Sequence, residues 1–357
     1  MNRINEIELK LNDKTPLNFE DGLWLYEKAD LDWLKERAQQ FKKEQFGSAV
    51  YYNRNVHFEP TNICVYSCKF CAFYRKPKST EADGAWDYTL DDLKKLVISH
   101  PDISEIHITG GVHPDRGVEY GEEMLRYVHS LNPNLHIKAF TAVEISFFAR
   151  KSGLTLQETL ERLQKAGLQS LPGGGAEIFD PEVRRKIAGG KAPAHTWLDV
   201  HATAHKIGLK SNATMLYGHI EKFEHRLKHM MELQKVQAQS NGFMSFIPLR
   251  YRNENNALSG LAEAEPSEDL RNFAVSRLFL SQIPHLKAYW VMLGWDVALQ
   301  SLAYGVDDLD GTIDDTTKIY SMAGGITAPK IHSNQLVDLI KDHGFEPVER
   351  NSLYQPI

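Results

Sequence analysis

Three cysteines, Cys64, Cys68 and Cys71, lie within eight residues in the spacing C-x3-C-x2-C, and the sequence of 357 residues contains no others. Thiolates bind soft metal centres, and three of them on one short loop can bind three irons of a [4Fe-4S] cluster. The fourth iron then lacks a protein ligand and stays open to a substrate or cofactor. Because no cysteine remains elsewhere as a disulfide partner, the pattern predicts a ligand loop and not a disulfide framework.

A zinc ion and three unligated thiols are the alternatives for this loop. Structural zinc sites normally take four protein ligands, and His57 could supply the fourth. His57 lies inside a predicted strand, however, where a lone histidine more often packs or supports another ligand. The sequence alone leaves the zinc site open but favours the cluster.

Two glycine-rich segments each follow a predicted strand. Thr109-Gly110-Gly111 ends the second strand, and Gly173-Gly174-Gly175 ends the fourth. Glycine lets a ligand approach the backbone closely, although a tight turn after a strand would need the same residues. Both segments are therefore candidates for contact with a bound molecule.

Polar side chains follow the third, fourth and fifth predicted strands. Glu177 could accept hydrogen bonds from a ribose or a cationic amine, or it could cap the following turn. Glu144 fits a cofactor contact and a structural carboxylate equally well. Asn212 and Thr214 share one face of the fifth strand, whereas His219 either leans over the strand ends or only begins a helix.

These candidates need a scaffold that brings strand ends together. From Asn53 almost to the end, short β-rich runs alternate with amphipathic helical patterns, which predicts an α/β fold, a (β/α)8 TIM-type barrel with reactive groups at the carboxyl ends of its strands. The predicted strands are 54–59, 104–109, 135–141, 168–171, 209–216, 242–247, 285–292 and 304–309. The predicted helices are 90–99, 120–130, 155–166, 196–207, 221–239, 267–281, 294–303 and 333–343.

The start of the chain differs from this alternation. Residues 1–50 show helical spacing of apolar positions and predict an N-terminal helical extension that caps the barrel domain 51–357. The polar stretch 252–267 predicts one long loop, and no repeat or low-complexity linker divides the chain.

Composition indicates an ordinary globular protein that acts on a small molecule. The 41 basic and 47 acidic residues give a formal net charge of -6 without a long run of one sign, so we expect no nucleic-acid or membrane partner. The N-terminal residues lack an apolar core followed by a small-residue cleavage site, and no later stretch has about 18 uninterrupted apolar residues. We therefore expect the protein to stay in the cytoplasm.

The cysteine loop, with Phe70 just before its last cysteine, resembles the signature of the radical S-adenosylmethionine superfamily. The resemblance implies that S-adenosylmethionine chelates the open iron and yields a 5′-deoxyadenosyl radical after one-electron reduction. It also implies that Thr109-Gly110-Gly111 contacts the methionine amino group of that co-substrate. The implied cofactor-binding residues are Phe70, Thr109, Gly110, Gly111, Glu144, Glu177 and Asn212, beside the metal ligands Cys64, Cys68 and Cys71.

Residues 50–350 resemble a subgroup that contains the aminofutalosine synthases, the cyclic dehypoxanthinyl futalosine synthases and the deazaflavin-forming synthase subunits. The segments 171–179, 288–294 and 308–312 look most like the aminofutalosine synthases. That family adds the adenosyl radical to 3-[(1-carboxyvinyl)oxy]benzoate in menaquinone biosynthesis. The sibling enzymes, in which the radical abstracts hydrogen, stay open as alternatives.

Such a reaction needs groups that bind two substrate carboxylates. It also needs an external electron donor, such as flavodoxin or ferredoxin. Cationic or hydrogen-bonding side chains are the usual partners of carboxylates. The candidates on the sequence are His219, Arg250 after the sixth strand and Arg277 on a later helix. Tyr289 and Trp290 could wall the cavity or simply pack in the core.

Overall fold

The computed structural model describes residues 3–314 and 316–357. Within these residues one sheet contains nine strands, and the spatial order of eight of them is β7-β6-β5-β4-β3-β2-β1-β8, with β9 paired to β1. All of these pairings are parallel. The strands are β1 (Ala49–Phe58), β2 (Glu105–Ile108), β3 (His136–Ala139), β4 (Ser170–Leu171), β5 (Lys210–Tyr217), β6 (Phe243–Arg250), β7 (His285–Leu286), β8 (Asp308–Ile313) and β9 (Glu346–Glu349).

A contact between β7 and β8 closes the ring of strands. Lys287, directly after β7, forms a parallel bridge with Asp308 of β8, and the Ala288 amide donates to the Asp308 carbonyl at 2.9 Å. The strands at the two ends of the order are thus neighbours. This arrangement confirms the predicted (β/α)8 barrel.

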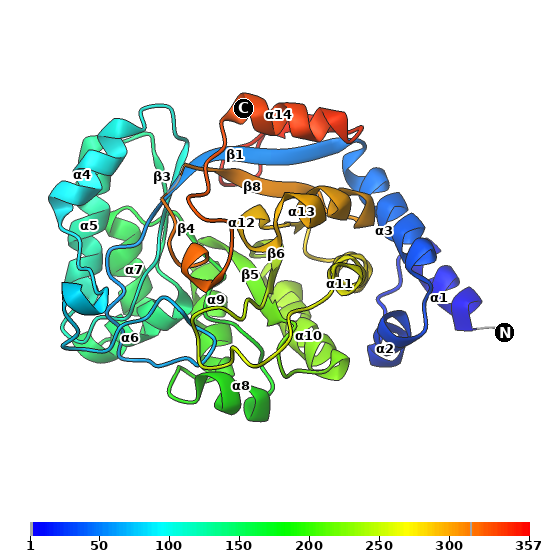
Figure 1. Ribbon diagram of the computed structural model, residues 1–357, viewed down its shortest axis with the longest axis horizontal. Coiled ribbons are helices and arrows are strands. Elements are labelled where there is room, and N and C mark those ends of the chain that lie inside the picture. The colour runs from blue at the N-terminus through cyan, green and yellow to red at the C-terminus, as the bar shows by residue number, and fades with distance from the viewer. Residues whose placement is uncertain (1–2, 315) are drawn as a thin grey trace.

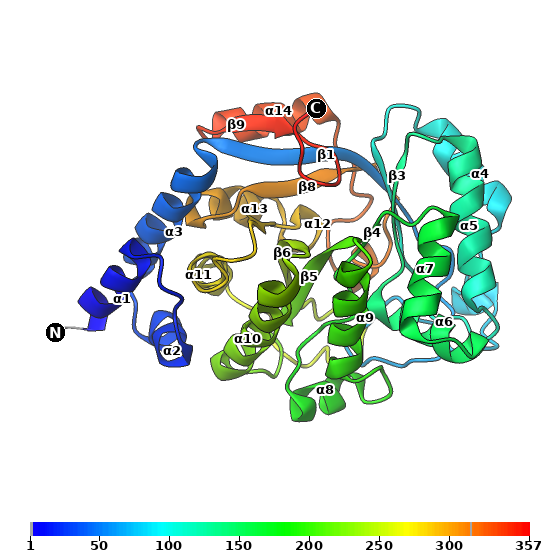
Figure 2. The ribbon, with the colours of Figure 1, turned by 180° about the vertical axis from the view of Figure 1, so that it is seen from behind.

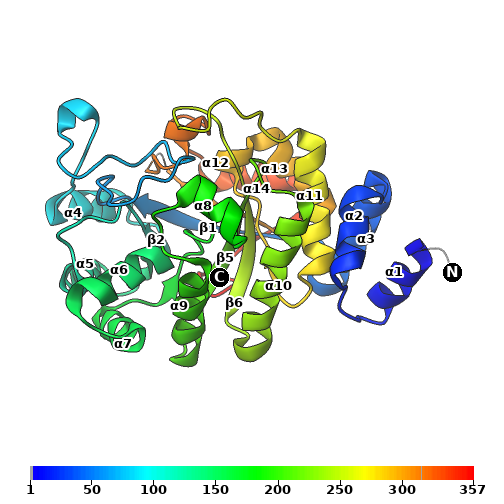
Figure 3. The same cartoon turned by 90° about the horizontal axis from the view of Figure 1, so that it is seen from below.

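Helices lie around the strands (Figures 1 and 3). They are α1 (Arg3–Asn12), α2 (Phe19–Glu27), α3 (Leu31–Phe46), α4 (Leu90–Ser99), α5 (Val118–Leu131), α6 (Ala142–Ser152), α7 (Leu156–Ala166), α8 (Pro181–Ala188), α9 (Ala194–Lys206), α10 (Phe223–Ser240), α11 (Pro266–Phe279), α12 (Trp290–Leu293), α13 (Trp295–Ser301) and α14 (Ser333–Asp342). None of the helices in the described ranges is long and apolar enough to cross a membrane.

Capping boxes in the sequence mark several helix starts. Thr89, Thr141 and Thr155 each bond the backbone amide three residues on, and the acidic residue at that position bonds back. Each box pairs two backbone donors that the first helical turn leaves free. The boxes therefore fix where α4, α6 and α7 begin.

The two ends of the chain meet the barrel at different places. Helices α1 to α3 precede β1, and α3 packs on α11 (Figure 1). At the other end, β9 pairs with the first half of β1 and α14 lies beside it (Figure 2). The division into a helical extension 1–50 and a barrel domain 51–357 stays a prediction.

Most predicted elements are present, with differences near the end of the barrel. The predicted strand 285–292 is wrong beyond residue 286, because Trp290–Leu293 forms the short helix α12. The weak strand predicted at 304–309 lies later, at Asp308–Ile313. Helices α6 and α8 and strand β9 were not predicted; α6 follows β3 directly and carries Glu144.

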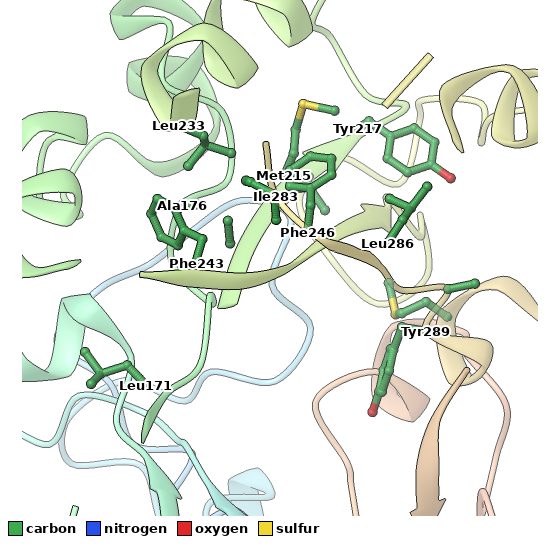
Figure 4. Packing of buried hydrophobic residues seen from close by; sticks show 14 of the residues in the cluster. Leu171, Ala176, Met215, Tyr217, Leu233, Phe243, Phe246, Ile283, Leu286 and Tyr289 are labelled. Atoms are coloured by element: carbon green, nitrogen blue, oxygen red, sulfur yellow. The ribbon is translucent and has the colours of Figure 1, made fainter. Parts of the chain in front are cut away.

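The buried side chains form one hydrophobic cluster between the strands and the helices. Figure 4 shows part of it, with Leu171 from β4, Met215 from β5, Phe243 and Phe246 from β6 and Leu286 from β7. Helices cover the outer face of the strands, so apolar residues on that face pack under them. The inner face lines the barrel interior and can carry a site.

Candidate functional site

The cysteine loop follows β1 and is held by backbone hydrogen bonds to several segments. The Cys64 amide donates to the Arg75 carbonyl at 2.8 Å, the Val65 amide to the Val112 carbonyl at 2.9 Å, and the Lys69 amide to the Ile187 carbonyl at 2.7 Å. The Arg75 side chain in turn donates to the carbonyls of Ala72, Phe73, Tyr74 and Asp83. The loop is thus fixed before any ligand binds.

The three thiols lie in surroundings that suit a cluster. Burial raises the pKa of Cys64, Cys68 and Cys71, that of Cys68 to about 12. Backbone amides of Tyr66 and Val112 point at the Cys64 sulfur, each at 3.4 Å. Buried thiols with such donors become thiolates when cationic iron compensates the charge.

The donor set fits the iron–sulfur cluster better than a single metal ion. Among the described residues, no three His, Cys, Asp or Glu side chains converge closely enough to hold one ion. Thiolates that each bind a different iron of a cube need no common centre. His57, the possible fourth zinc ligand, lies instead in the barrel interior, where its ring packs on His107 with centroids 4.6 Å apart.

The glycines after β2 are required by the close approach of the cysteine loop. A Cβ on Gly111 would lie 2.4 Å from the Ile63 carbonyl oxygen, and one on Gly110 would lie 2.8 Å from the Thr61 carbonyl oxygen. The Gly111 amide donates to the Thr61 carbonyl at 2.7 Å. These glycines therefore position the loop, and Gly110 also lines the cavity described below.

Glu144 has a structural environment. Its carboxylate accepts the Thr141 amide at 2.8 Å, the Thr141 hydroxyl at 2.7 Å, and the Thr109 hydroxyl and Gly110 amide at 3.3 Å each. Burial raises its pKa to about 7 in spite of these bonds. The side chain joins the start of α6 to the Thr109-Gly110 segment and is not among the residues that line the cavity.

Glu177 lies after the second glycine-rich segment and forms an ion pair with Lys191. The Glu177 backbone has a left-handed φ of 49°, which turns the chain after the glycines. Although burial opposes its charge, the Glu177 carboxylate and the Cys68 thiol raise the pKa of Lys191. The pair thus links this segment electrostatically to the cysteine loop.

A cavity of about 1300 Å³, its open mouth included, lies inside the barrel between the cysteine loop and the strands. Its upper wall contains the cysteine loop and the glycine-rich segments: Phe70, Cys71, Ala72, Phe73, Thr109, Gly110, Thr141, Pro172, Gly173, Gly174, Gly175, Glu177 and Lys191. Apolar and aromatic residues form a side wall, among them Ile247, Leu249, Tyr251, Tyr289, Met292, Ile319 and Tyr320. Such a cavity can hold a small molecule away from water.

The floor of the cavity is polar and charged. His57, His107, Lys138, Asn212, Lys287 and Asp310 line it, from β1, β2, β3, β5, the residue after β7, and β8. The Lys138 ammonium lies 2.7 Å from the Glu105 carboxylate, and that of Lys287 lies 2.6 Å from Asp310. In most barrels these inward positions carry branched apolar residues, so this floor is unusual for a packed core.

Several floor atoms have no hydrogen-bond partner within the described part of the chain. They are Nε2 of His57, Nε2 of His107 and Oδ1 of Asn212. Burial lowers the pKa of His57 to about 4 and that of His107 well below its usual value. Since buried polar groups are normally bonded, these neutral rings and this amide are suited to a polar ligand.

Three residues predicted to bind substrate carboxylates lie outside the cavity lining. Arg277 forms buried bonds with Asp307 and with the carbonyls of Gly305 and Pro284. Arg250 pairs with Asp269 at 3.2 Å. These bonds use the charge of both arginines to hold parts of the fold together.

His219 is also engaged elsewhere. Its Nδ1 lies 3.0 Å from Glu221, and its Nε2 lies 3.2 Å from the Leu216 carbonyl.

Most of the predicted cofactor-binding residues line the cavity, namely Phe70, Thr109, Gly110, Glu177 and Asn212. Gly111 is not among the lining residues.

Sequence reasoning missed Lys138, Lys287, Arg252 and Tyr320, which all line the cavity. A signal was present in the strands, because His136-Ile137-Lys138 and Asp308-Leu309-Asp310 alternate polar with apolar residues. Alternation places the polar residues on one face, and in a barrel covered by helices that face is the interior.

Two family models match the chain. The model for the radical SAM superfamily matches residues 58–233, and the model for the CofH/MqnC C-terminal region matches residues 240–357. The first contains the cysteine loop and both glycine-rich segments. The second contains β6 to β9 and therefore one side of the cavity.

Curated relatives match over nearly the whole length. The aminodeoxyfutalosine synthase of Thermus thermophilus is 41% identical, covering 99% of this chain and 96% of the relative. The aminodeoxyfutalosine synthase of Streptomyces coelicolor is 39% identical, covering 98% and 93%. Among solved structures, methylornithine synthase (PylB) superposes with a TM-score of 0.73 over 96% of this chain and 97% of that one, at 15% identity, a likeness of fold alone.

Proposed function

This chain belongs to the radical S-adenosylmethionine superfamily, and from that premise we propose that it is an enzyme that joins the adenosyl group of S-adenosylmethionine to 3-[(1-carboxyvinyl)oxy]benzoate. The products are 6-amino-6-deoxyfutalosine, methionine and carbon dioxide, in menaquinone biosynthesis. The full-length similarity to two aminodeoxyfutalosine synthases carries this proposal. The cavity under the cysteine loop supports it, since it joins that loop and both glycine-rich segments to an aromatic wall and a polar floor.

Cys64, Cys68 and Cys71 would hold the [4Fe-4S] cluster by its three ligated irons. When bound, the cluster supplies the electron that cleaves S-adenosylmethionine to methionine and the adenosyl radical. The Tyr66 and Val112 amides would stabilise negative charge on the Cys64 sulfur by donating hydrogen bonds to it. Hydrogen bonds to cluster sulfurs of this kind tune the reduction potential.

The upper wall of the cavity would bind the co-substrate. Thr109 and Gly110 would meet the methionine amino group, and Phe70 would lie against the adenosyl group. Glu177 in this wall has a carboxylate, and Asn212 on the floor has a free carboxamide oxygen, for hydroxyl or amine donors of the nucleoside. Glu144 and Gly111 would act indirectly, by holding the Thr109-Gly110 segment and the cysteine loop in register.

The aromatic side wall would keep water from the reacting carbons. Tyr289 and Tyr320 lie with ring centroids 4.8 Å apart and face the cavity with Ile319 and Met292. A radical that adds to an alkene needs close alignment and exclusion of water, which a packed wall provides. Conventional acid–base residues have little to do in such a step.

The electron must come from outside the chain. We propose an external one-electron donor such as flavodoxin or ferredoxin, because the cluster has to be reduced before it can cleave S-adenosylmethionine. We also propose a cytoplasmic reaction. The loop that carries Lys69 and Tyr74 reaches the surface beside residues 255–259 and offers a short path to the cluster ligands.

An anaerobic assay tests the function. The reconstituted and reduced protein is mixed with S-adenosylmethionine and 3-[(1-carboxyvinyl)oxy]benzoate, and products are followed by mass spectrometry. We expect 6-amino-6-deoxyfutalosine and methionine in equal amounts. Free 5′-deoxyadenosine without an adduct would overturn the addition reaction and direct the work to the substrates of the sibling enzymes.

A further inference from the structure

We propose that Lys138 and Lys287 bind the benzoate carboxylate of the substrate at the floor of the cavity and so determine which aryl enol ethers the enzyme accepts. The inference rests on the proposed function, because it takes the substrate to be an aryl enol ether with two carboxylates. It assigns a role to two lysines, one on β3 and one directly after β7, that no local motif marks.

Both ammonium groups lie at the floor with little exposure to solvent. Lys138 is 3% exposed and Lys287 is 2% exposed, and both line the cavity. Lysine is rarely buried so deeply unless it has a partner. Each one has a carboxylate partner at short distance, Glu105 for Lys138 and Asp310 for Lys287.

These pairs do not use all the donors of the lysines. An ammonium group carries three N–H donors, and in the described part of the chain each lysine makes one hydrogen bond, at 2.7 Å for Lys138 and 2.6 Å for Lys287. The remaining donors lie at the cavity wall. Two ammonium groups with spare donors form a receptor for a carboxylate, which accepts several hydrogen bonds.

The neighbours at the floor favour an anionic ligand over a water-filled gap. The rings of His57 and His107 are neutral, and the Nε2 atom of each has no partner within the described ranges. Either ring can therefore donate a hydrogen bond to a bound carboxylate. Arg350 and Asp308, both buried and outside the cavity lining, pair with each other at 2.6 Å.

The shape of the substrate decides which carboxylate reaches the floor. The alkene must lie next to the adenosyl group, which the cysteine-loop end of the cavity would hold. The enol carboxylate is attached to the alkene itself and stays at that end. The benzoate carboxylate lies across the aromatic ring and points away from the reacting carbon, toward residues that lie within the strands and not in the loops after them.

Arg252 offers a separate place for the enol carboxylate. It follows β6, at the ends of the strands where the cysteine loop lies, and it lines the cavity. Its guanidinium bonds Gly324 and Glu263, whereas its Nε has no hydrogen-bond partner in residues 3–314 and 316–357. The two carboxylates of the substrate therefore have cationic partners at opposite ends.

The test crosses enzyme variants with substrate variants. Wild type, Lys138→Gln and Lys287→Gln are each measured with the full substrate and with an analogue that carries hydrogen in place of the benzoate carboxylate. We expect wild type to prefer the full substrate by about 10- to 100-fold in kcat/KM, the range that buried charge-assisted hydrogen bonds give. In either lysine variant we expect this preference to fall below about threefold.

A second measurement does not depend on turnover. Without reductant, calorimetric titration of the holoenzyme with S-adenosylmethionine present gives the Kd of both ligands, and we expect the same loss of preference. Lys42→Gln is the matched control, because Lys42 is buried against Phe345 and lies outside the cavity lining. It should keep the wild-type preference.

The outcomes separate the two proposals. If wild type neither binds nor converts the full substrate, the proposed function fails. If wild type makes the adduct but the lysine variants lose activity equally for both ligands, the lysines are structural and the inference is overturned. Should a lysine variant fail to fold, the preference of wild type itself decides, since an equal Kd for the two ligands contradicts any carboxylate receptor.

Discussion

The two ends of the cavity are built in different ways. At the cysteine-loop end, the backbone determines the shape: Gly111 bonds the Thr61 carbonyl at 2.7 Å, and its neighbours leave no room for a Cβ. At the floor, side chains from separate strands determine the shape, with Lys138 paired to Glu105 and Lys287 to Asp310. The first end suits a co-substrate common to a superfamily, and the second suits a substrate particular to one reaction.

The comparison predicts where a substitution affects all chemistry and where it affects only specificity. Changes at the cysteine-loop end should remove radical formation whatever the substrate. Changes at the floor should leave S-adenosylmethionine cleavage in place and alter substrate choice. The following predictions test this contrast, starting with the largest effect.

Cys68→Ala should abolish both product formation and cleavage of S-adenosylmethionine, because the cluster loses one of three ligands and no other cysteine is available. Absorption near 400 nm and iron content should fall, while circular dichroism should keep the signal of the folded barrel. Ser67→Ala, an exposed position on the same loop, serves as the control. Full activity of Cys68→Ala would exclude the cluster assignment.

Gly111→Ala should reduce cluster content and activity by about tenfold or more. The added Cβ would lie 2.4 Å from the Ile63 carbonyl oxygen, so the cysteine loop must move, and overpacking of this kind typically costs about 1–3 kcal/mol. Gly260→Ala, where a Cβ meets nothing within 4 Å, is the control. Iron per chain and the rate of 5′-deoxyadenosine formation are the measurements. Normal cluster content would show that the backbone there yields easily.

The sequence predicts the first end of the cavity well, because its signals are contiguous. Cys64 to Cys71 and Thr109 to Gly111 can be recognised on a short stretch of chain, and the alternation of strands and helices places them at strand ends. The sequence does not show why glycine is needed at residues 110 and 111, which is their close contact with the backbone of residues 61–63. That contact depends on how the cysteine loop folds back against the end of β2.

Apart from Asn212, the floor was not predicted as a binding site, for a physical reason. Its members lie between residues 57 and 310, each on or directly after a different strand, and only closure of the barrel brings them together. Arginines that look free in the sequence, such as Arg277, turn out to be consumed by buried partners like Asp307. A positive charge in the sequence therefore does not by itself identify a side chain that binds a ligand, because only the folded structure shows which partners the side chain already has.

Glu177→Gln should weaken binding of S-adenosylmethionine by about tenfold, because one charge-assisted hydrogen bond contributes about 1.5–3 kcal/mol. The carboxylate pairs with Lys191 at the cysteine-loop end, so the substrate Kd should change less than the S-adenosylmethionine Kd. Glu182→Gln, at an exposed position of α8 where Glu182 pairs with Lys186, is the control. An unchanged Kd would remove Glu177 from the co-substrate site.

Glu59 supports the side wall of the cavity, and its substitution should give a smaller effect that depends on pH. Its carboxylate, at the end of the first barrel strand, accepts the Thr317 hydroxyl at 2.8 Å and the amides of Lys318 and Ile319 at 2.9 and 3.1 Å. These bonds hold the segment that carries Ile319 and Tyr320 over the side wall of the cavity. Burial nevertheless raises the pKa of Glu59 from 4.5 to about 7.

A pKa raised on folding means that the folded state favours the protonated acid. The stability that Glu59 contributes is therefore fully present below pH 4.5 and is lost as pH rises through 7, by at most about 3 kcal/mol. Glu59→Gln is neutral throughout, so its Tm should fall less than that of wild type between pH 5 and 8, by a few degrees. Glu161→Gln, an exposed position on α7, should follow wild type. Parallel Tm profiles for Glu59→Gln and wild type would show that Glu59 is already ionised in the folded protein, with the amides of residues 318 and 319 outweighing its burial.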